Sequence, residues 1–432
     1  MSHPTAPPRE SALLVGLALP GMPAWEVRES LDELARLADT ATLAVAERLL
    51  QTRPRVDPAY YIGKGKANQL RELAEGCGAD MILFDNDLSP AQMRNLEKLT
   101  EMRILDRSAI ILDIFARHAR TRSAHVQVEL AQLKYLLPRL TRAWTHLSRQ
   151  AGGGAIRGMG AAGGRGPGET QLEVDRRLVR TRIGSLQSEL NRIGSQMANA
   201  RKGRGDLFRV ALVGYTNAGK STLMRALSGA DVLVQDQLFA TLDSTTRSVD
   251  LEGGPRILLT DTVGFINRLP HHLFASFRAT LEEAAEADLL LHVVDRSHPQ
   301  YAHQMGTVEG VLAELGIEDR PLLVVHNKID RLDPDGDEEE ETAACGREDV
   351  VAVSALTGTG LDDLRGAIRA HCQEQEVTLD LHIPQAEGRL LSQLHEQGEV
   401  LEQSYDPREV RLRVRLGRAW AERWSLERFQ PG

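Results

Sequence analysis

One motif constrains the fold of this chain more than any other, and it lies at residues 209–223, RVALVGYTNAGKSTL. A continuous apolar run leads into Gly214. Gly219, Lys220 and Ser221 then complete the spacing G-x-x-x-x-G-K-S before a helical pattern begins. The glycines let backbone N–H groups wrap phosphates at the positive end of a helix, while the lysine neutralises phosphate oxygens and the serine ligates magnesium. The motif therefore predicts an α/β domain that binds a nucleoside triphosphate.

The base attached to these phosphates is indicated by residues 327–330, NKID, and by SAL at residues 354–356. A carboxylate at Asp330 accepts hydrogen bonds from guanine N1–H and N2–H2, whereas adenine offers no matching pair of donors. Such a mismatch is worth a factor on the order of 10⁴. Asn327 and Lys328 would brace the base and the loop, and the N–H of Ala355 would meet guanine O6. An ATP-dependent kinase is the competing hypothesis, and NKID argues against it.

Residues 261–268, DTVGFINR, form what we call the sensor segment, because Asp-x-x-Gly after a strand senses the terminal phosphate in many nucleotide hydrolases. Asp261 would hold magnesium through water, and the N–H of Gly264 would meet the γ-phosphate. Many GTPases place the glutamine that orients the attacking water directly after this glycine, where this chain has Phe265. A phenyl ring cannot orient water. Either the chain is no hydrolase, or part of its catalytic apparatus lies elsewhere; Phe265 is alternatively a core side chain.

A second magnesium ligand is expected from residues 238–248, LFATLDSTTRS, which we call the threonine segment. Its hydroxyl groups are candidate ligands because magnesium prefers oxygen. Thr241, Thr245 and Thr246 compete for this role, and composition does not choose among them.

The charge of the chain is distributed very unevenly. Its formal net charge is −9, yet residues 101–205 carry 19 Lys and Arg against 8 Asp and Glu. The average therefore conceals a basic module, which is typical of a nucleic-acid partner.

Within the basic module, apolar residues alternate steps of three and four, first from Val126 to Leu147 and then from Leu172 to Met197. This spacing predicts two helices packed as an antiparallel coiled-coil hairpin. Pro138 should kink the first helix.

The tip of this hairpin, residues 148–173, is rich in glycine, and no acidic residue occurs from Leu130 through Gly168. A flexible cationic tip on a rigid stalk suits entry into a crevice lined by phosphates. A disordered linker with a solvated charged face is the competing interpretation. The candidate RNA contacts are Arg149, Arg157 and Arg165.

The remaining pattern predicts four segments of mixed α/β class. In the first, strands alternate with helices, one of which should begin after Ser89. The third contains five short apolar runs, as expected for parallel strands covered on both faces. The expected segments are a small N-terminal α/β domain at 1–115, the basic helical hairpin at 116–205, a P-loop domain with a parallel sheet at 206–373 and a small α+β domain at 374–432.

No segment approaches the roughly 20 apolar residues that a membrane span requires. The three cysteines, Cys77, Cys345 and Cys372, lie far apart and suggest neither a disulfide framework nor a zinc site. We therefore expect a soluble cytoplasmic protein without a membrane partner.

Several motifs together resemble the HflX family of translational GTPases, and the likeness extends from about residue 12 to residue 373. The motifs that carry it are YYIGKGK at 60–66, RGPGETQLEVDRR at 165–177, GYTNAGKSTL at 214–223, FATLDSTTR at 239–247 and DTVGFINRLPHHLFASFRATLEEAAEADLLLHVVD at 261–295. The sequence departs from the family's pattern at two places. Ser244 occupies a position where the family usually has proline, and the glycine-rich tip of the hairpin, called the glycine loop below, looks longer than its common form.

The resemblance implies a GTPase that binds the large ribosomal subunit and its ribosomal RNA, and that splits or rescues stalled ribosomes. The glycine loop would reach toward the peptidyl-transferase region. The resemblance also implies that Thr241 is the magnesium threonine and that a hydrophobic residue such as Phe265 is the normal occupant of the glutamine position. Hydrolysis should then be slow in isolation and stimulated by the ribosome. We expect a monomer that is partly ribosome-associated.

The resulting site prediction has three parts. GTP is the substrate and Mg²⁺ the cofactor. The catalytic residues are Lys220, Thr241 and Gly264, and the magnesium ligands are Ser221 and Thr241, with Asp261 acting through water. The residues expected around GTP are Gly214, Tyr215, Thr216, Asn217, Ala218, Gly219, Lys220, Ser221, Thr222, Phe239, Ala240, Thr241, Leu242, Asp243, Asp261, Thr262, Val263, Gly264, Asn327, Lys328, Ile329, Asp330, Ser354, Ala355 and Leu356.

One further alternative belongs to another functional class. A GTP-dependent scaffold would use the coiled coil to join a protein partner and would never touch RNA.

Overall fold

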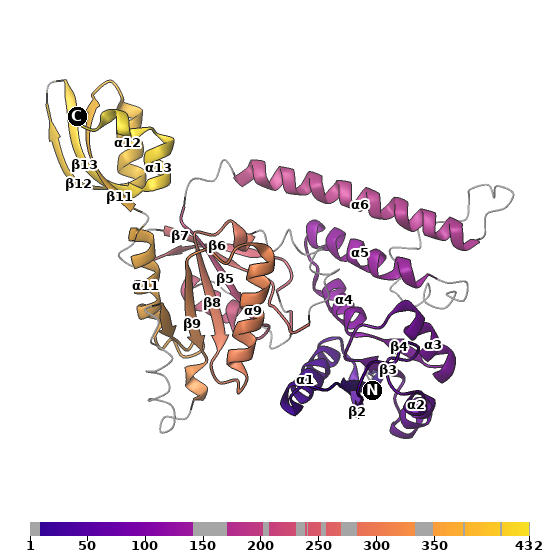
Figure 1. Ribbon diagram of the computed structural model, residues 1–432. Helices are drawn as coiled ribbons and strands as arrows, with labels where there is room; N and C mark the ends of the chain where they lie inside the picture. Colours follow the sequence, from indigo (N-terminus) through magenta and orange to yellow (C-terminus); the bar gives the residue numbers. More distant parts are fainter. Residues whose placement is uncertain are drawn as a thin grey trace, which may run out of the picture.

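The structure is a computed structural model of the chain (Figure 1). Its strands form three sheets within the described residues, and these sheets follow one another along the sequence. The described residues are 9–140, 171–201, 207–229, 238–239, 241–251, 256–268, 283–332, 349–374, 376–406 and 408–431.

The N-terminal domain is a parallel four-stranded sheet in the order β2-β1-β3-β4, flanked by helices. Ser89 caps α3 through a reciprocal capping box with Gln92, which confirms the predicted helix start. The elements are β1 (Ser11–Ala18), α1 (Ala24–Thr40), β2 (Ala44–Thr52), α2 (Lys64–Cys77), β3 (Met81–Phe84), α3 (Pro90–Thr100), β4 (Arg103–Leu105) and α4 (Arg107–His118).

The predicted hairpin is present as α5 (Arg122–Leu136) and α6 (Gln171–Arg201), which lie side by side (Figure 1). Their contact buries Val126, Leu130 and Leu133 of α5 against Leu186 of α6. The ion pairs Arg122–Glu189 and Glu129–Arg182 run in opposite sequence order, so the helices are antiparallel.

The expectation of one kinked helix from Val126 to Leu147 is wrong. The helix α5 ends at Leu136, and Pro138 lies in a 3₁₀ turn, Leu137–Arg139. Proline lacks the N–H that the next helical hydrogen bond needs, and its ring clashes with the preceding turn, so the helix stops there. Residues 141–170, which include the predicted tip contacts Arg149, Arg157 and Arg165, lie outside the described residues.

The central domain is built on a six-stranded sheet in the order β10-β9-β8-β5-β7-β6. The five predicted strands are parallel, and β6 adds an antiparallel edge strand that was not predicted. The elements are β5 (Arg209–Gly214), α7 (Lys220–Ser228), β6 (Thr245–Asp250), β7 (Arg256–Asp261), β8 (Leu289–Asp295), α9 (Tyr301–Leu315), β9 (Leu322–Asn327), β10 (Val350–Ala352) and α11 (Leu361–Glu374).

The C-terminal domain is an antiparallel sheet in the order β11-β13-β12 with its own apolar core. Strands and helices are both present, as expected for an α+β domain. The elements are β11 (Glu376–Pro384), α12 (Gly388–Gln397), β12 (Glu399–Tyr405), β13 (Glu409–Gly417) and α13 (Arg418–Arg423). Among the helices in the described part of the chain, none combines the length and apolar character needed to cross a bilayer.

The packing of the hairpin gives a test of its stability. Leu186 is fully buried between the two helices, so Leu186→Ala should destabilise α6 by about 2–5 kcal/mol. Leu178 on the same helix is 40% exposed, and Leu178→Ala should cost less than about 0.5 kcal/mol. Amide hydrogen exchange within α6 measures the difference. Equal effects of the two substitutions would show that the hairpin contact does not stabilise α6.

Candidate nucleotide site

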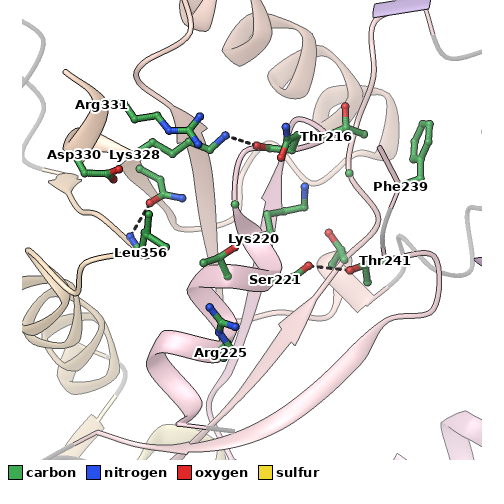
Figure 2. Close-up of a pocket in the computed structure, with 17 residues that line it drawn as sticks. Thr216, Lys220, Ser221, Arg225, Phe239, Thr241, Lys328, Asp330, Arg331 and Leu356 are labelled. Carbon is green, nitrogen blue, oxygen red and sulfur yellow. Dashed lines mark hydrogen bonds between the residues drawn. The ribbon is translucent and has the colours of Figure 1, made fainter. Parts of the chain in front are cut away.

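A cavity of about 300 Å³ lies where β5, β7 and β9 end and α7 begins (Figure 2). Ligands of parallel α/β sheets bind at such carboxyl ends. The lining residues are Thr216, Asn217, Gly219, Lys220, Ser221, Thr222, Arg225, Phe239, Thr241, Thr262, Gly264, Asn327, Lys328, Asp330, Arg331, Ala355 and Leu356.

The phosphate end of the cavity requires its glycines. Gly214 has φ +151°, and a Cβ added to it would lie 2.3 Å from the carbonyl oxygen of Val293. Gly219 has φ +97°, and its Cβ would lie 2.3 Å from Nδ2 of Asn327. Both positions combine positive φ with a close neighbour, so only glycine fits.

Lys220 is held across this loop. Its Nζ donates to the carbonyl oxygens of Gly214, at 3.0 Å, and Tyr215, at 2.9 Å. Burial lowers the pKa of Lys220 to about 8, against the opposing effect of the Asp261 carboxylate. Near neutral pH the ammonium is therefore mostly charged, as phosphate binding requires.

Oxygen atoms of three side chains converge beside Lys220. The Oγ of Ser221 lies 2.6 Å from Oδ2 of Asp261, and Oγ1 of Thr241 lies 2.9 Å from both of these atoms. Oδ1 of Asp261 is buried and has no hydrogen-bond partner, and burial raises the pKa of this carboxyl. Hard oxygen donors with one orphaned carboxylate atom fit Mg²⁺. Among the competing threonines, Thr245 and Thr246 instead begin β6.

The NKID segment braces the other end of the cavity, opposite Ser221 and Thr241 (Figure 2). Nδ2 of Asn327 donates to the carbonyl of Ala218 at 2.9 Å, and Nζ of Lys328 donates to Asp295 at 2.7 Å. The Ser354 hydroxyl donates to Asp330 at 2.6 Å and orients its carboxylate.

One expected guanine contact differs in the structure. The N–H of Ala355, predicted to meet guanine O6, donates instead to Oδ1 of Asn327 at 3.0 Å. The amide of Asn327 thereby ties the phosphate loop to the SAL segment, because its other end already binds Ala218.

The threonine segment is anchored outside the cavity. The ring of Phe239 meets that of Phe115 on α4 edge to face, with centroids 4.7 Å apart. The Asp243 carboxylate accepts from the N–H groups of Arg120, at 2.8 Å, and Thr121, at 3.0 Å, and from the Thr121 hydroxyl. Asp243 was predicted at GTP, but it binds the start of α5, where backbone N–H groups favour an anion.

Phe265 is 2% exposed and belongs to the apolar core shared with the N-terminal domain. Its N–H donates to Gly214 at 3.1 Å, and its carbonyl accepts from Thr216 at 2.7 Å. The interpretation of Phe265 as a core side chain is confirmed. The described residues of the sensor segment therefore place no water-orienting side chain where glutamine would stand.

The predicted site residues divide into three groups. Most line the cavity, whereas Ala240 lies outside the described residues. The predicted residues that do not line it are Gly214, Tyr215, Ala218, Leu242, Asp243, Asp261, Val263, Ile329 and Ser354.

Two lining residues were missed in the sequence analysis. Arg225 lies one helical turn after Ser221 on α7, and Arg331 directly follows NKID. Arg225 could have been predicted, because residues four positions apart on a helix lie on the same face, and Ser221 was already placed at the site.

A largely parallel sheet whose first strand feeds a phosphate loop, with Asp-x-x-Gly at the carboxyl end of β7 and Asn-Lys-x-Asp at that of β9, defines a P-loop GTPase. Three family models match the chain: "GTP-binding GTPase N-terminal" at residues 28–116, "GTP-binding GTPase Middle Region" at 118–204 and "50S ribosome-binding GTPase" at 209–328.

Curated relatives place the chain more narrowly. It is 47% identical to GTPase HflX of Magnetococcus marinus over 86% of this chain and 84% of the relative. It is 44% identical to GTPase HflX of Escherichia coli over 90% of each chain. The chain belongs to the HflX family of GTPases, and its activity is the hydrolysis of GTP.

Among solved structures, the chain is similar to a GTP-binding protein from Sulfolobus solfataricus in complex with GDP. The TM-score is 0.43, with 24% identity over 84% of this chain and 98% of that chain.

Guanine selection gives a second prediction. Asp330→Asn should weaken GTP binding on the order of 10³-fold, because two charge-assisted acceptor contacts are lost. It should also improve binding of xanthosine triphosphate, whose O2 accepts from an amide. Competition against a fluorescent GTP analogue measures both effects. Asp362→Asn, at a side chain 92% exposed, is the matched control. Unchanged preference for guanine would exclude Asp330 from base recognition.

The pKa of Lys220 gives a third prediction. In the nucleotide-free protein the pKa of Lys220 is about 8, and phosphates bound beside the ammonium raise this pKa. Above about pH 8, binding of GTP is therefore accompanied by uptake of a proton. Affinity for GTP should therefore fall about tenfold per pH unit above about pH 8. Calorimetry in two buffers of different ionisation enthalpy measures the uptake. If GTP binding takes up no proton at about pH 8.5, the lowered pKa of Lys220 is contradicted.

Proposed function

We propose that this GTPase hydrolyses GTP slowly by itself and that the large ribosomal subunit stimulates hydrolysis. The protein binds this subunit and helps to split or rescue stalled ribosomes. The observation that carries the proposal is Phe265, buried where many GTPases place the water-orienting glutamine. A GTPase without this glutamine depends on a partner, which orders the segments around the γ-phosphate or supplies the group that orients the attacking water.

The chain's own residues have distinct roles in this proposal. Lys220 binds the β- and γ-phosphate oxygens, and the N–H of Gly264 binds the γ-phosphate. Ser221 and Thr241 would hold Mg²⁺ directly, with Asp261 acting through water. A bound Mg²⁺ neutralises charge that develops on the phosphates during transfer.

The guanine contacts follow from the NKID segment. Asp330 accepts from the base, while Asn327 and Lys328 keep the surrounding loops in place. The hydrogen bond from Ser354 holds the Asp330 carboxylate in one orientation, which reduces the entropy lost on binding.

Ribosome association is supported by two kinds of observation. The central domain matches a family model described as a 50S ribosome-binding GTPase. The charge of residues 101–205 is strongly positive, which is typical of a nucleic-acid partner such as ribosomal RNA. We assign the RNA contacts to Arg149, Arg157 and Arg165 in the hairpin tip, and we expect a cytoplasmic monomer that is partly ribosome-associated.

GTP turnover with and without purified large subunits tests the proposal. Stimulation should reach at least about 10²-fold, and binding with a GTP analogue should weaken steeply with salt. Replacement of Arg149, Arg157 and Arg165 by Gln should reduce ribosome affinity at least about tenfold.

A matched triple replacement of Arg411, Arg413 and Arg415 on the C-terminal sheet removes equal charge outside the basic module. It should leave affinity within about twofold of the parent chain. If the tip replacement has no effect while GTP-dependent binding persists, a scaffold without RNA contact explains the data better. Full turnover without ribosomes would refute the proposal.

A further inference from the structure

The carboxyl end of the N-terminal sheet is built like a ligand site but is filled by the chain itself. In open parallel sheets, ligands bind outside the strand ends. Here Asp85 follows β3, and Arg107 follows β4 as the first residue of α4. Both contact the sensor segment of the central domain, more than 150 residues away in sequence.

Arg107 is the centre of this contact. Its side chain is 1% exposed, and its Nη1 donates to Asp85 at 2.8 Å while Nη2 pairs with Glu33 of α1. The same Nη2 donates to the carbonyl oxygen of Asn267 at 3.1 Å. Burial alone would lower the pKa of Arg107, but Glu33 and Asp85 raise it overall, so the guanidinium stays charged.

Tyr215 extends the contact into the phosphate loop. Its hydroxyl donates to Glu33 and accepts from the N–H of Asn267 at 2.7 Å. Burial, followed by the Glu33 carboxylate, raises the pKa of Tyr215 well above 10, so the phenol keeps its proton. Both main-chain groups of Asn267 are therefore bound by side chains that share the Glu33 carboxylate.

Arg268 makes a second, more accessible connection. Its Nη2 donates to Glu26 of α1 at 3.1 Å, and its Nη1 lies 3.5 Å from Asp85. The backbone of Arg268 has φ +54°, a conformation that non-glycine residues rarely adopt. In this conformation its side chain reaches two carboxylates of the N-terminal domain.

The position of the sensor segment matches what a γ-phosphate requires. A Cβ added to Gly264 would lie 3.0 Å from Nζ of Lys220, so its main chain lies beside the phosphate-binding ammonium. In the same structure Thr241 reaches Ser221 and Asp261, an arrangement that the γ-phosphate and magnesium stabilise in GTPases.

We infer that Glu33, Arg107, Tyr215 and the Glu26–Arg268 pair form an interdomain clamp, which holds the sensor segment where GTP needs it. The clamp residues are positioning residues, and the clamp rests on the proposed binding of GTP in the cavity. A nucleotide that favours the clamped arrangement must bind more tightly when the clamp is intact. Loss of the clamp therefore weakens GTP binding more than GDP binding.

The test uses the full chain and the dissociation constants of a non-hydrolysable GTP analogue and of GDP. Tyr215→Phe removes the shared hydroxyl, and Arg268→Gln removes the accessible charge. Each should lower the preference for the analogue over GDP about five- to tenfold. Tyr405→Phe, at a residue 72% exposed on β12, is the matched control and should leave this preference unchanged.

A double variant tests the pairing itself. If Arg268 acts through Glu26, then Arg268→Gln combined with Glu26→Gln should be no worse than the more severe single variant. Additive losses would overturn this pairing. If these residues only stabilised the fold, their replacement would weaken binding of the analogue and of GDP equally. An unchanged preference for the analogue over GDP in folded Tyr215→Phe and Arg268→Gln would therefore overturn the clamp.

The failure of the clamp is distinguishable from failure of the proposed function. If the parent chain prefers the analogue and its turnover responds to ribosomes, but the variants keep the same preference, only the clamp is wrong. If the parent chain binds no GTP, the proposed function fails first and the clamp fails with it.

Discussion

A buried guanidinium, that of Arg107, joins the sensor segment of the central domain to the N-terminal domain, and the inferred interdomain clamp depends on this contact. Burying an ion is costly unless its charge is compensated, and the two terminal nitrogens of Arg107 meet two carboxylates and a main-chain carbonyl. Hydrophobic residues of similar size often stabilise a fold equally well. A hydrogen bond is directional, however, whereas an apolar contact is not. The bond from Arg107 to the carbonyl oxygen of Asn267 therefore restricts the position of this main-chain group.

The same interface has an apolar part, which also involves the threonine segment. Phe265 and Phe239 both belong to the core that continues into the N-terminal domain, and Phe239 packs against Phe115 of α4. Asp243, two residues after Thr241, binds the start of α5. Both segments expected to respond to GTP are therefore attached to the N-terminal domain or to the hairpin. This attachment gives a nucleotide-dependent change at the cavity a direct physical route to the stalk.

Local features of the fold were predictable from sequence, whereas interdomain contacts were not. The phosphate loop, the five parallel strands and the helix start at Ser89 follow from spacing and capping within a few residues. The contacts between Arg268 and Glu26, or between Tyr215 and Glu33, join residues about 180 to 240 positions apart, and no periodicity reports them. The burial of Phe265 was only one of two open interpretations, because a single sequence does not show what covers a ring. Pro138 was assigned a kink because seam spacing continued beyond it, although its backbone chemistry ends the helix.

The most direct measurement is amide hydrogen exchange at Phe265 and Asn267 in the full chain, bound either to a non-hydrolysable GTP analogue or to GDP. Their N–H groups donate to Gly214 and to the Tyr215 hydroxyl. If the interface holds this segment in the arrangement that GTP favours, both amides should exchange at least about tenfold more slowly with the analogue than with GDP. Equal exchange, or slower exchange with GDP, would contradict the account.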